Sequence, residues 1–97
     1  MKTKEFIKRV EELGFEVESI GLFYRIKNKN DLVIAAICKN VLLQINTNYL
    51  GWEFVDEEDK TKLFNLFFDY AKTPIGNRGE KKFYFDLANF KLVEVEE

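Results

Sequence analysis

The sequence predicts a single α+β domain whose helices pack on one face of an antiparallel sheet. Apolar residues recur every three to four positions near the N-terminus and again across residues 57–72, a spacing typical of helices, whereas they alternate every second position in other segments, as in strands. Short links between the strand segments favour a meander. We expect an N-terminal helix, a four-stranded antiparallel meander, a long helix and one or two C-terminal strands within one domain, residues 1–97.

The N-terminal helix is expected over Lys2–Leu13. Four apolar residues form one stripe along it: Phe6, Ile7, Val10 and Leu13. Thr3 is the expected N-cap, and Gly14 suits the position just past the last turn, where the backbone often adopts a positive φ.

Four strands are expected before the long helix: Phe15–Glu18, Leu22–Ile26, Leu32–Cys38 and Val41–Ile45. The third is apolar at every position, so it should be a central strand that is covered on both faces. The turns between them are expected at Ile20–Gly21, Asn28–Asp31 and Lys39–Asn40. Residues 49–54 fit either a fifth short strand or a loop held by Trp52.

The long helix is expected over Glu57–Lys72, with Asp56 as its N-cap and acidic residues at the positive end of the helix dipole. Pro74 should end it, since proline disfavours helical geometry in the preceding residue. After a glycine-bearing loop, the alternation of residues 83–88 predicts a strand. Residues 90–95 fit either a further strand or a bulged continuation.

Aromatic residues are unusually abundant, with 10 Phe, 4 Tyr and 1 Trp. Large rings fill the thin core between a sheet and two helices with few side chains, which explains those on predicted inward faces. That inward set is Phe6, Phe15, Phe64, Phe67, Phe83 and Phe85. Other aromatic residues fall outside it and, where several are exposed together, mark a protein-binding surface. This candidate interface is Tyr24, Tyr49, Trp52 and Tyr84.

Basic residues number 15 against 17 acidic ones, a net charge of −2, whereas nucleic-acid-binding domains are usually strongly basic. Two loops nonetheless combine cations with aromatic neighbours, as surfaces that bind single strands do. The candidate nucleic-acid contacts are Arg25, Lys27, Lys29, Arg78, Lys81 and Lys82. This interpretation requires both loops to lie on one side of the sheet. The alternative is that the cations keep a solvated face and edge of the sheet soluble.

Residues 76–79 read Gly-Asn-Arg-Gly, and their backbone amides together with Arg78 are of the kind that holds a phosphate. The segment follows a helix and lacks the Gly-Lys-Ser/Thr ending of a Walker loop. A helix-to-strand connection whose glycines permit a positive φ explains it better.

Catalytic chemistry has little support in the sequence. Histidine, the commonest general base, is absent. Ser19 has no motif to activate it, and Cys38 lies in an apolar run that favours a buried, inert thiol. The consecutive acidic residues 56–59 would fan around a helix start rather than converge on a cation. We expect no catalytic residues, no metal site and no cofactor, in a protein that is not an enzyme.

The sequence also favours a cytoplasmic location. Residues 1–13 are charged throughout, unlike a signal peptide. The apolar runs are far shorter than the roughly 20 residues that span a bilayer. A single cysteine forms no internal disulfide, which fits a reducing compartment. No membrane partner is expected.

Residues 70–85 read YAKTPIGNRGEKKFYF. A helix that ends in Ala-Lys-Thr-Pro-Ile, followed by Arg and by Glu-Lys-Lys before an aromatic strand, resembles small uncharacterised proteins of phages and prophages of Gram-positive bacteria. Residues 1–14, and Gly51 with Trp52 before an acidic helix start, are similar in style. In those relatives the loop is richer in glutamate, whereas Gly76, Asn77 and Gly79 stand here. The resemblance implies an accessory phage protein in a bacterial cytoplasm and carries over no catalytic residues.

Three functions are compatible with these features. The first is a non-enzymatic protein-interaction module, for which a homodimer is one form, because pairing would bury apolar surface that a thin core leaves out. The second is an accessory nucleic-acid-binding protein that uses the basic loops. The third is an inhibitor of a host defence nuclease, whose exposed carboxylates would be Glu53–Asp59 and Glu94–Glu97.

Overall fold

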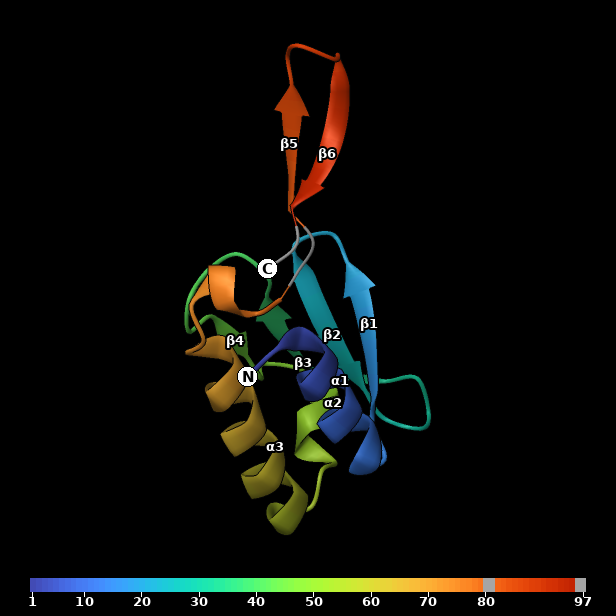
Figure 1. Ribbon diagram of the computed structural model, residues 1–97. Coiled ribbons are helices and arrows are strands. Elements are labelled where there is room, and N and C mark those ends of the chain that lie inside the picture. The colour runs from blue at the N-terminus through green and yellow to red at the C-terminus, as the bar shows by residue number, and fades with distance from the viewer. Residues whose placement is uncertain (80–81, 96–97) are drawn as a thin grey trace.

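The computed structural model describes residues 1–79 and 82–95 and confirms the α+β architecture. Its helical elements are α1 (Thr3–Glu12), α2 (Leu50–Glu53), α3 (Glu57–Ala71) and the 3₁₀ turn η1 (Ile75–Asn77). Its strands are β1 (Glu16–Ile20), β2 (Phe23–Lys27), β3 (Val33–Cys38), β4 (Ile45–Asn46), β5 (Lys82–Asp86) and β6 (Lys91–Val95). Figure 1 shows α1 and α3 packed on one face of the sheet of β1 to β4. None of the helices in the described ranges is long and apolar enough to cross a membrane.

The main sheet is an antiparallel meander in the order β1-β2-β3-β4. The third strand is buried along nearly its whole length, which confirms it as a central strand. Because side chains alternate along β2, Tyr24 and Ile26 face the helices, and Phe23 and Arg25 face the opposite side. We call that opposite side the outer face of the sheet.

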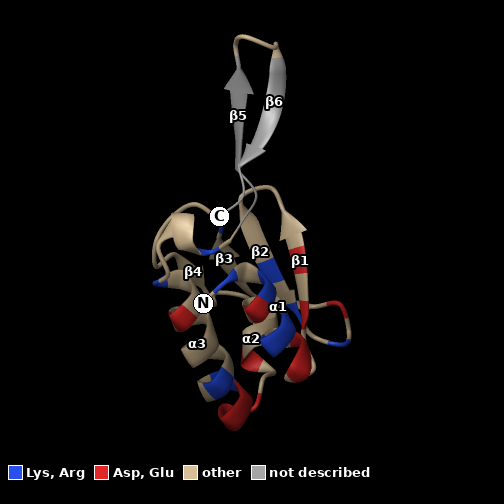
Figure 2. Cartoon of the chain, viewed as in Figure 1, with Lys and Arg blue, Asp and Glu red and all other residues tan. Residues whose placement is uncertain are grey.

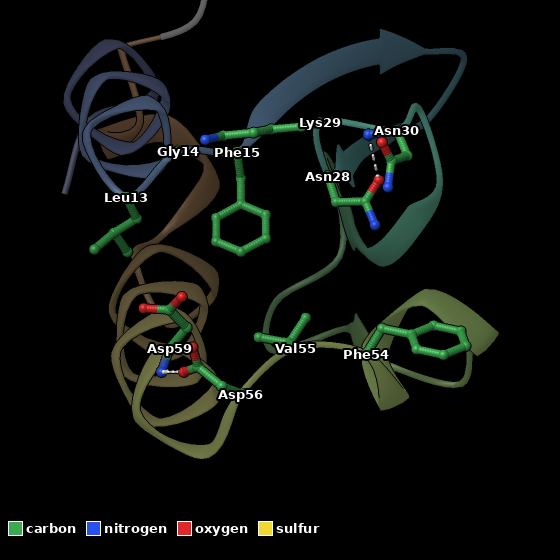
Figure 3. A pocket seen from close by; sticks show the side chains of 10 residues that line it. All are labelled: Leu13, Gly14, Phe15, Asn28, Lys29, Asn30, Phe54, Val55, Asp56 and Asp59. Atoms are coloured by element: carbon green, nitrogen blue, oxygen red, sulfur yellow. Dashed lines mark hydrogen bonds between the residues drawn. The ribbon is translucent and has the colours of Figure 1, made fainter.

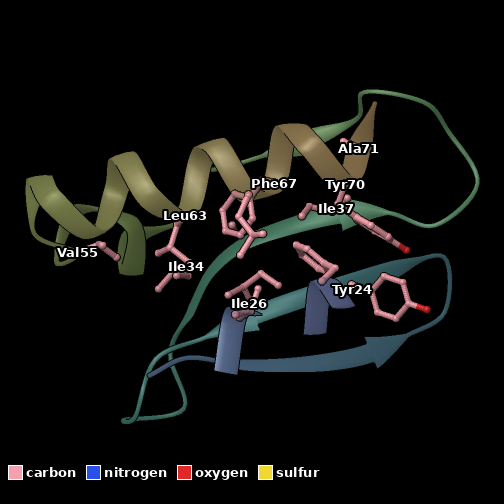
Figure 4. Close-up of a cluster of buried hydrophobic side chains, with 13 residues drawn as sticks. Tyr24, Ile26, Ile34, Ile37, Val55, Leu63, Phe67, Tyr70 and Ala71 are labelled. Atoms are coloured by element: carbon pink, nitrogen blue, oxygen red, sulfur yellow. The ribbon is translucent and has the colours of Figure 1, made fainter. Parts of the chain in front are cut away.

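The core lies between the inner face of the sheet and the two long helices (Figure 4). The rings of Phe6 in α1 and Tyr70 in α3 stack with their centroids 4.3 Å apart, and Phe67 meets Phe6 edge-on at 6.3 Å. The hydroxyl of Tyr70 is hydrogen-bonded to Oγ1 of Thr3 at 2.7 Å, so the polar end of the ring has a partner inside the core. Strand residues fill the remaining space: Ile26, Ile34, Ala35 and Ile37.

The helix ends agree with the sequence except at one residue. Lys2, not Thr3, is the N-cap of α1, and its side chain makes no capping hydrogen bond. Thr3 is the first helical residue, and its hydroxyl is hydrogen-bonded to Tyr70 in the core. Gly14 follows α1 with a φ of +91°, as expected. At α3 the side chain of Asp56 accepts a hydrogen bond from a backbone N–H of the first turn at 2.8 Å, which confirms it as the N-cap.

The strand expected over Val41–Ile45 is wrong, because only Ile45–Asn46 pairs with β3. Leu43 has a φ of +56°, and its N–H donates to the carbonyl of Ala71 at the end of α3, 2.9 Å away. This bond to a helix that comes later in the sequence draws the segment away from the sheet. The apolar alternation that predicts a strand is therefore overridden by a tertiary contact.

Residues 49–54 form neither a fifth strand nor a loop, but contain the short helix α2. Gly51 is buried, and a Cβ atom on it would lie only 2.4 Å from the carbonyl oxygen of Val33. This close approach lets α2 cover the edge of β3 that the short β4 leaves unpaired. Trp52 is half-buried against Phe67, with the ring centroids 6.2 Å apart, and so does hold the segment to the core.

The C-terminal residues form a separate antiparallel hairpin, so the second of the two segments is a further strand. We call residues 82–95 the hairpin arm; residues 87–90 form its turn. Neither β5 nor β6 joins the four-stranded sheet. Figure 1 shows the arm projecting from the body, and the molecule measures 54 × 22 × 21 Å. Its radius of gyration is 15.4 Å, whereas a compact domain of this length has about 12.5 Å.

Two aromatic residues lie on the opposite face from the one that the sequence predicts for them. Tyr24 is buried, because it shares the inner face of β2 with Ile26, and its ring meets that of Tyr70 at 6.2 Å. Phe64 is exposed on the flank of α3, because Leu63 and its neighbours one turn along occupy the face toward the sheet. The side chains of Phe83 and Phe85 lie outside the described residues.

Candidate functional site

The four residues of the candidate aromatic interface do not share one surface. Tyr24 is part of the core, and Trp52 is half-buried beside α3, with the Lys60 ammonium 5.9 Å from its ring centroid. Tyr49 is half-buried and lines a depression on the outer face of the sheet. For Tyr84 only the backbone is described, within β5. Of the three side chains described, Tyr49 therefore lines a surface that a partner could contact.

Arg78 is fully buried, so it is corrected from a candidate ligand contact to a structural residue. Its guanidinium donates four hydrogen bonds to backbone carbonyls: Nε to Thr73 at 3.1 Å, Nη1 to Cys38 at 3.1 Å and Lys39 at 3.0 Å, and Nη2 to Ala71 at 3.0 Å. The cation thus lies at the negative end of α3, where the last carbonyls lack partners within the helix.

The same residue also ties down the start of the chain. The carbonyl of Arg78 accepts a hydrogen bond from the N–H of Thr3 at 2.8 Å, so one residue joins the end of α3, the end of β3 and the beginning of α1. Gly79 follows with a φ of +72°, as a connection between a helix and a strand requires. The guanidinium leaves no surface for a phosphate, and the segment acts as a connection.

Two further candidate contacts are engaged in ion pairs on the outer face. Arg25 and Lys27 both donate to the carboxylate of Glu18, Lys27 at 2.5 Å, and Lys27 also reaches Asp31 at 3.0 Å. Hydrogen bonds from Lys27, and after it from Arg25, hold the pKa of Glu18 below its ordinary value. The bond to Glu18, followed by that to Asp31, raises the pKa of Lys27. These cations already have acidic partners.

The basic loops do not converge in the part of the chain that the structure describes. Lys29 is exposed in the turn before β3, whereas Arg78 contacts the carbonyl at the end of that strand. The 6 residues of β3 span about 20 Å at roughly 3.3 Å per residue. Lys81 falls outside the described residues, and Lys82 is described only by its backbone. The common face that nucleic-acid binding requires is not formed by the residues described.

The residue types that suggest nucleophiles have structural surroundings. Ser19 Oγ lies 2.5 Å from Nζ of Lys39, whose ammonium is 4.9 Å from the ring centroid of Tyr24. The Lys39 side chain donates to the serine hydroxyl and lies over an aromatic ring, so both of its contacts are structural. The thiol of Cys38 is buried, as expected, and donates to Oδ1 of Asn40 at 3.1 Å.

The acidic residues that begin α3 are engaged locally. Asp56 caps the helix, Glu57 lies 3.8 Å from the Lys60 ammonium, and Glu58 pairs with Lys62 at 3.0 Å. Across residues 1–79 and 82–95, no group of three or more His, Cys, Asp or Glu is placed to hold a metal ion. Helix capping and i,i+4 pairing account for this acidic run.

A pocket of about 320 Å³ lies at the end of the body away from the hairpin arm (Figure 3). The ring of Phe15 projects into the space between Val55 and Asp59, and Lys29 lies at the rim beside the Asn28 turn. The volume is at the lower limit of small-molecule sites, which enclose about 300–1,000 Å³. Two of its polar side chains are used within the turn and the helix cap, where Asn28 and Asp56 accept backbone hydrogen bonds.

A second depression, of about 260 Å³, lies on the outer face of the sheet. Ile20 and Phe23, which pair across β1 and β2, remain 43% and 40% exposed at its wall. Ala36, Arg25, Asn46 and Tyr49 complete the lining. The β1–β2 turn and the adjoining strand ends carry no charged residue, and Figure 2 shows most of the acidic residues toward the other end of the body. The sequence signal was present at Phe23, which is apolar at a position opposite the inward residues of its strand.

The turn of the hairpin arm is the other apolar surface that the sequence analysis missed. Leu87 and Phe90 are 76% and 79% exposed, more than the other large apolar side chains of the described residues. They are the first and last residues of the four-residue turn, and Phe90 has a φ of +51°. The alternation of residues 83–88 predicts a strand there, and it gives no sign that the strand leaves the body.

Two apolar surfaces therefore stand out as candidate functional sites: the depression on the outer face and the tip of the arm. Comparison with protein-family models, with curated proteins and with solved structures finds no match to this chain. What these surfaces do has to be argued from their own residues and geometry.

Proposed function

We propose that this protein is a non-enzymatic protein-interaction module that contacts its partner through the tip of the hairpin arm. The observation that carries the proposal is the exposure of Leu87 and Phe90 at the end of an arm that projects from the body. Exposing two large apolar side chains to water is unfavourable by about 25 cal/mol for each Å² of apolar surface. A protein surface that covers them recovers this free energy.

The arm itself supports the same interpretation. A two-stranded hairpin without further packing is at best marginally stable in water. Both strands of the arm have open edges and pair only with each other. Contact with a partner would stabilise the hairpin as well as cover its tip. The resemblance of residues 70–85 to small phage and prophage proteins fits an accessory protein that acts by binding.

Binding to nucleic acid is the weaker alternative. Arg78 is buried, and Arg25 and Lys27 have acidic partners, so three of the six proposed contacts are engaged within the fold. The tip exposes two large apolar side chains, which suit protein rather than phosphate.

Affinity capture with a matched control tests the proposal. The immobilised wild type, the tip variant Phe90→Asp and the control Phe54→Asp are each exposed to a lysate of a Gram-positive bacterium and to the fluorescently labelled chain itself. Phe54 is 71% exposed, somewhat less than the two tip side chains, but it lies in the body beside α2. We expect at least one protein to bind to the immobilised wild type and to the Phe54→Asp control, but not to the Phe90→Asp variant. If the tip variant retains the same proteins as the wild type, the proposal is wrong.

A further inference from the structure

Two of the exposed surfaces in the described part of the chain, the tip of the arm and the depression on the outer face, are compatible in size. The tip offers two large side chains, Leu87 and Phe90, on a narrow turn. The depression on the outer face is lined by three apolar residues, Ile20, Phe23 and Ala36, and by Arg25, Asn46 and Tyr49. Its volume of about 260 Å³ lies below the about 300–1,000 Å³ of small-molecule sites. A recess of this size suits one or two inserted side chains better than a free ligand.

We infer that the protein forms a two-fold symmetric dimer in which the arm of each protomer seats its tip in the outer-face depression of the other. The inference rests on the proposed function and names its partner, a second copy of this chain. One type of contact, made twice, covers both tips and both depressions. Such an isologous arrangement closes on itself and leaves no open end for further copies.

The placement of the two surfaces supports this dimer, which we call the arm exchange because each arm contacts the body of the other protomer. The depression includes Ile20 and Phe23, which flank the β1–β2 turn. Figure 1 shows that turn at the end of the body from which the arm projects. The base of each arm therefore lies near the depression of its own protomer, and the tip lies one arm length away. When two arms of equal length run side by side in opposite directions, each tip reaches the base of the other arm, and hence the other depression.

The chain's own depression is not covered by its own tip. Each strand of the arm has 5 residues, so the ladder reaches about 17 Å outward at roughly 3.4 Å per residue. Leu87 and Phe90 are 76% and 79% exposed, so most of their surface is left uncovered by their own protomer. A second copy in the opposite orientation supplies the missing contact without a change in the fold.

The register of the arm suits a surface that is covered by a partner. Phe85 stands opposite Leu92, and the neighbouring pair is Tyr84 with Val93. Successive pairs of a ladder belong to opposite faces of the ribbon. The face of Phe85 and Leu92 also holds Phe83 opposite Glu94, whereas the face of Tyr84 and Val93 also holds the charged pair Asp86 and Lys91. One face of the ribbon is therefore mainly apolar in residue type, a pattern typical of a strand that is covered on one side.

The test begins with the oligomeric state, measured by size-exclusion chromatography with light scattering across a range of concentrations. We expect dimers of the wild type, and a dimer dissociation constant at least about thirty-fold higher for Phe90→Asp, the effect of losing a central contact residue. Aspartate tolerates the positive φ at residue 90, so the turn should survive. Phe54→Asp should dimerise like the wild type. Circular dichroism checks the fold, and Leu87→Lys repeats the test if Phe90→Asp does not fold.

Disulfide trapping then identifies the surfaces in contact. The variants Leu87→Cys and Ile20→Cys are purified separately and mixed under mild oxidation, and the linked residues are identified by mass spectrometry. We expect a disulfide-linked dimer in the mixture, joining position 87 of one chain to position 20 of the other, and none with either variant alone. This outcome requires the tip of one copy to reach the depression of another.

The outcomes separate the inference from the proposed function. A dimer that Phe90→Asp leaves intact, or one without the mixed disulfide, overturns the arm exchange. A monomer at all concentrations also overturns it, yet the proposed function survives if a lysate protein is lost with the tip variant. If the chain is monomeric and the tip variant captures the same proteins as the wild type, both are wrong.

Discussion

The guanidinium of Arg78 lies 4.7 Å from the ring centroid of Tyr70, inside the core and at the C-terminal end of α3. The ring of Tyr70 also stacks on that of Phe6 in α1. Its hydroxyl is hydrogen-bonded to Thr3. The cation, the ring and the carbonyls around them join α1, α3 and the end of β3. A loop arginine thus contributes to the packing of three elements.

Replacing Arg78 with methionine should be among the most destabilising substitutions in the body. Four backbone carbonyls lose their partner, and a buried acceptor without a partner costs about 1–3 kcal/mol. We expect the free energy of unfolding to fall by at least about 3 kcal/mol, and the melting temperature by at least roughly 12 °C. Arg78→Lys should lose less, since an ammonium keeps the charge but not the planar set of donors.

Thermal and urea unfolding of these variants measure the loss. Lys72→Met is the matched control, because Lys72 is an exposed cation in the C-cap position of the same helix. It should change the free energy of unfolding by less than about 0.5 kcal/mol. A loss below about 1 kcal/mol for Arg78→Met would show that water replaces the guanidinium and would contradict its structural role.

Gly51→Ala should destabilise the protein although alanine favours helices. Its Cβ would lie 2.4 Å from the carbonyl oxygen of Val33 and 3.0 Å from Cγ2 of Ile34, so α2 would have to move off the edge of β3. Overpacking of this kind costs about 1–3 kcal/mol. Urea denaturation measures it, with the exposed Glu53→Ala in the same helix as the control. Equal stability of the two variants would mean that α2 is not held against the strand.

The two long helices could be predicted from the sequence because their signals are local. The apolar period and the cap at Asp56 need no knowledge of the rest of the chain. The segment 41–44 could not, because its conformation depends on the bond from Leu43 to Ala71, 28 positions later. Local alternation predicts a strand whether or not a neighbour is there to pair with it.

The residues of the candidate sites show the same difference between features that are encoded locally and features that depend on distant contacts. Arg78 lies between two glycine-bearing positions of a polar loop, which predicts a surface cation, and its burial depends on carbonyls up to 40 positions away. The detachment of the arm likewise depends on packing that the pattern of residues 83–88 does not encode. Phe23 is different, since its apolar character on the outer face of a strand could be read from alternation alone, whereas Ile20 is expected in the turn and instead ends β1.

Acid should weaken the fold through Glu18. Because hydrogen bonds from Lys27 and then Arg25 lower its pKa in the folded state, the folded protein binds fewer protons than the unfolded chain below the ordinary value of 4.5. The contribution of the Glu18 carboxylate to the free energy of unfolding is therefore complete above pH 4.5, and it is lost as the pH falls through the lower pKa of Glu18 in the folded state. Urea midpoints between pH 7 and pH 3 should fall more steeply for the wild type than for Glu18→Gln. The same slope in both would contradict the role of this carboxylate, and Glu16→Gln on the same strand is the control.

The thiol of Cys38 should report on the contacts of Arg78. It is 3% exposed, and its own backbone carbonyl accepts a hydrogen bond from the guanidinium, so a reagent reaches the sulfur only when the end of β3 opens. In the wild type, an aromatic disulfide should react far more slowly with the folded protein than with the protein in urea. Arg78→Lys should accelerate labelling of the folded state by roughly tenfold for each 1.4 kcal/mol of stability lost, while Lys72→Met should leave the rate unchanged. If the thiol of the folded wild type reacts as fast as in urea, or if Arg78→Lys leaves its rate unaltered despite a loss of stability, the end of β3 opens independently of Arg78.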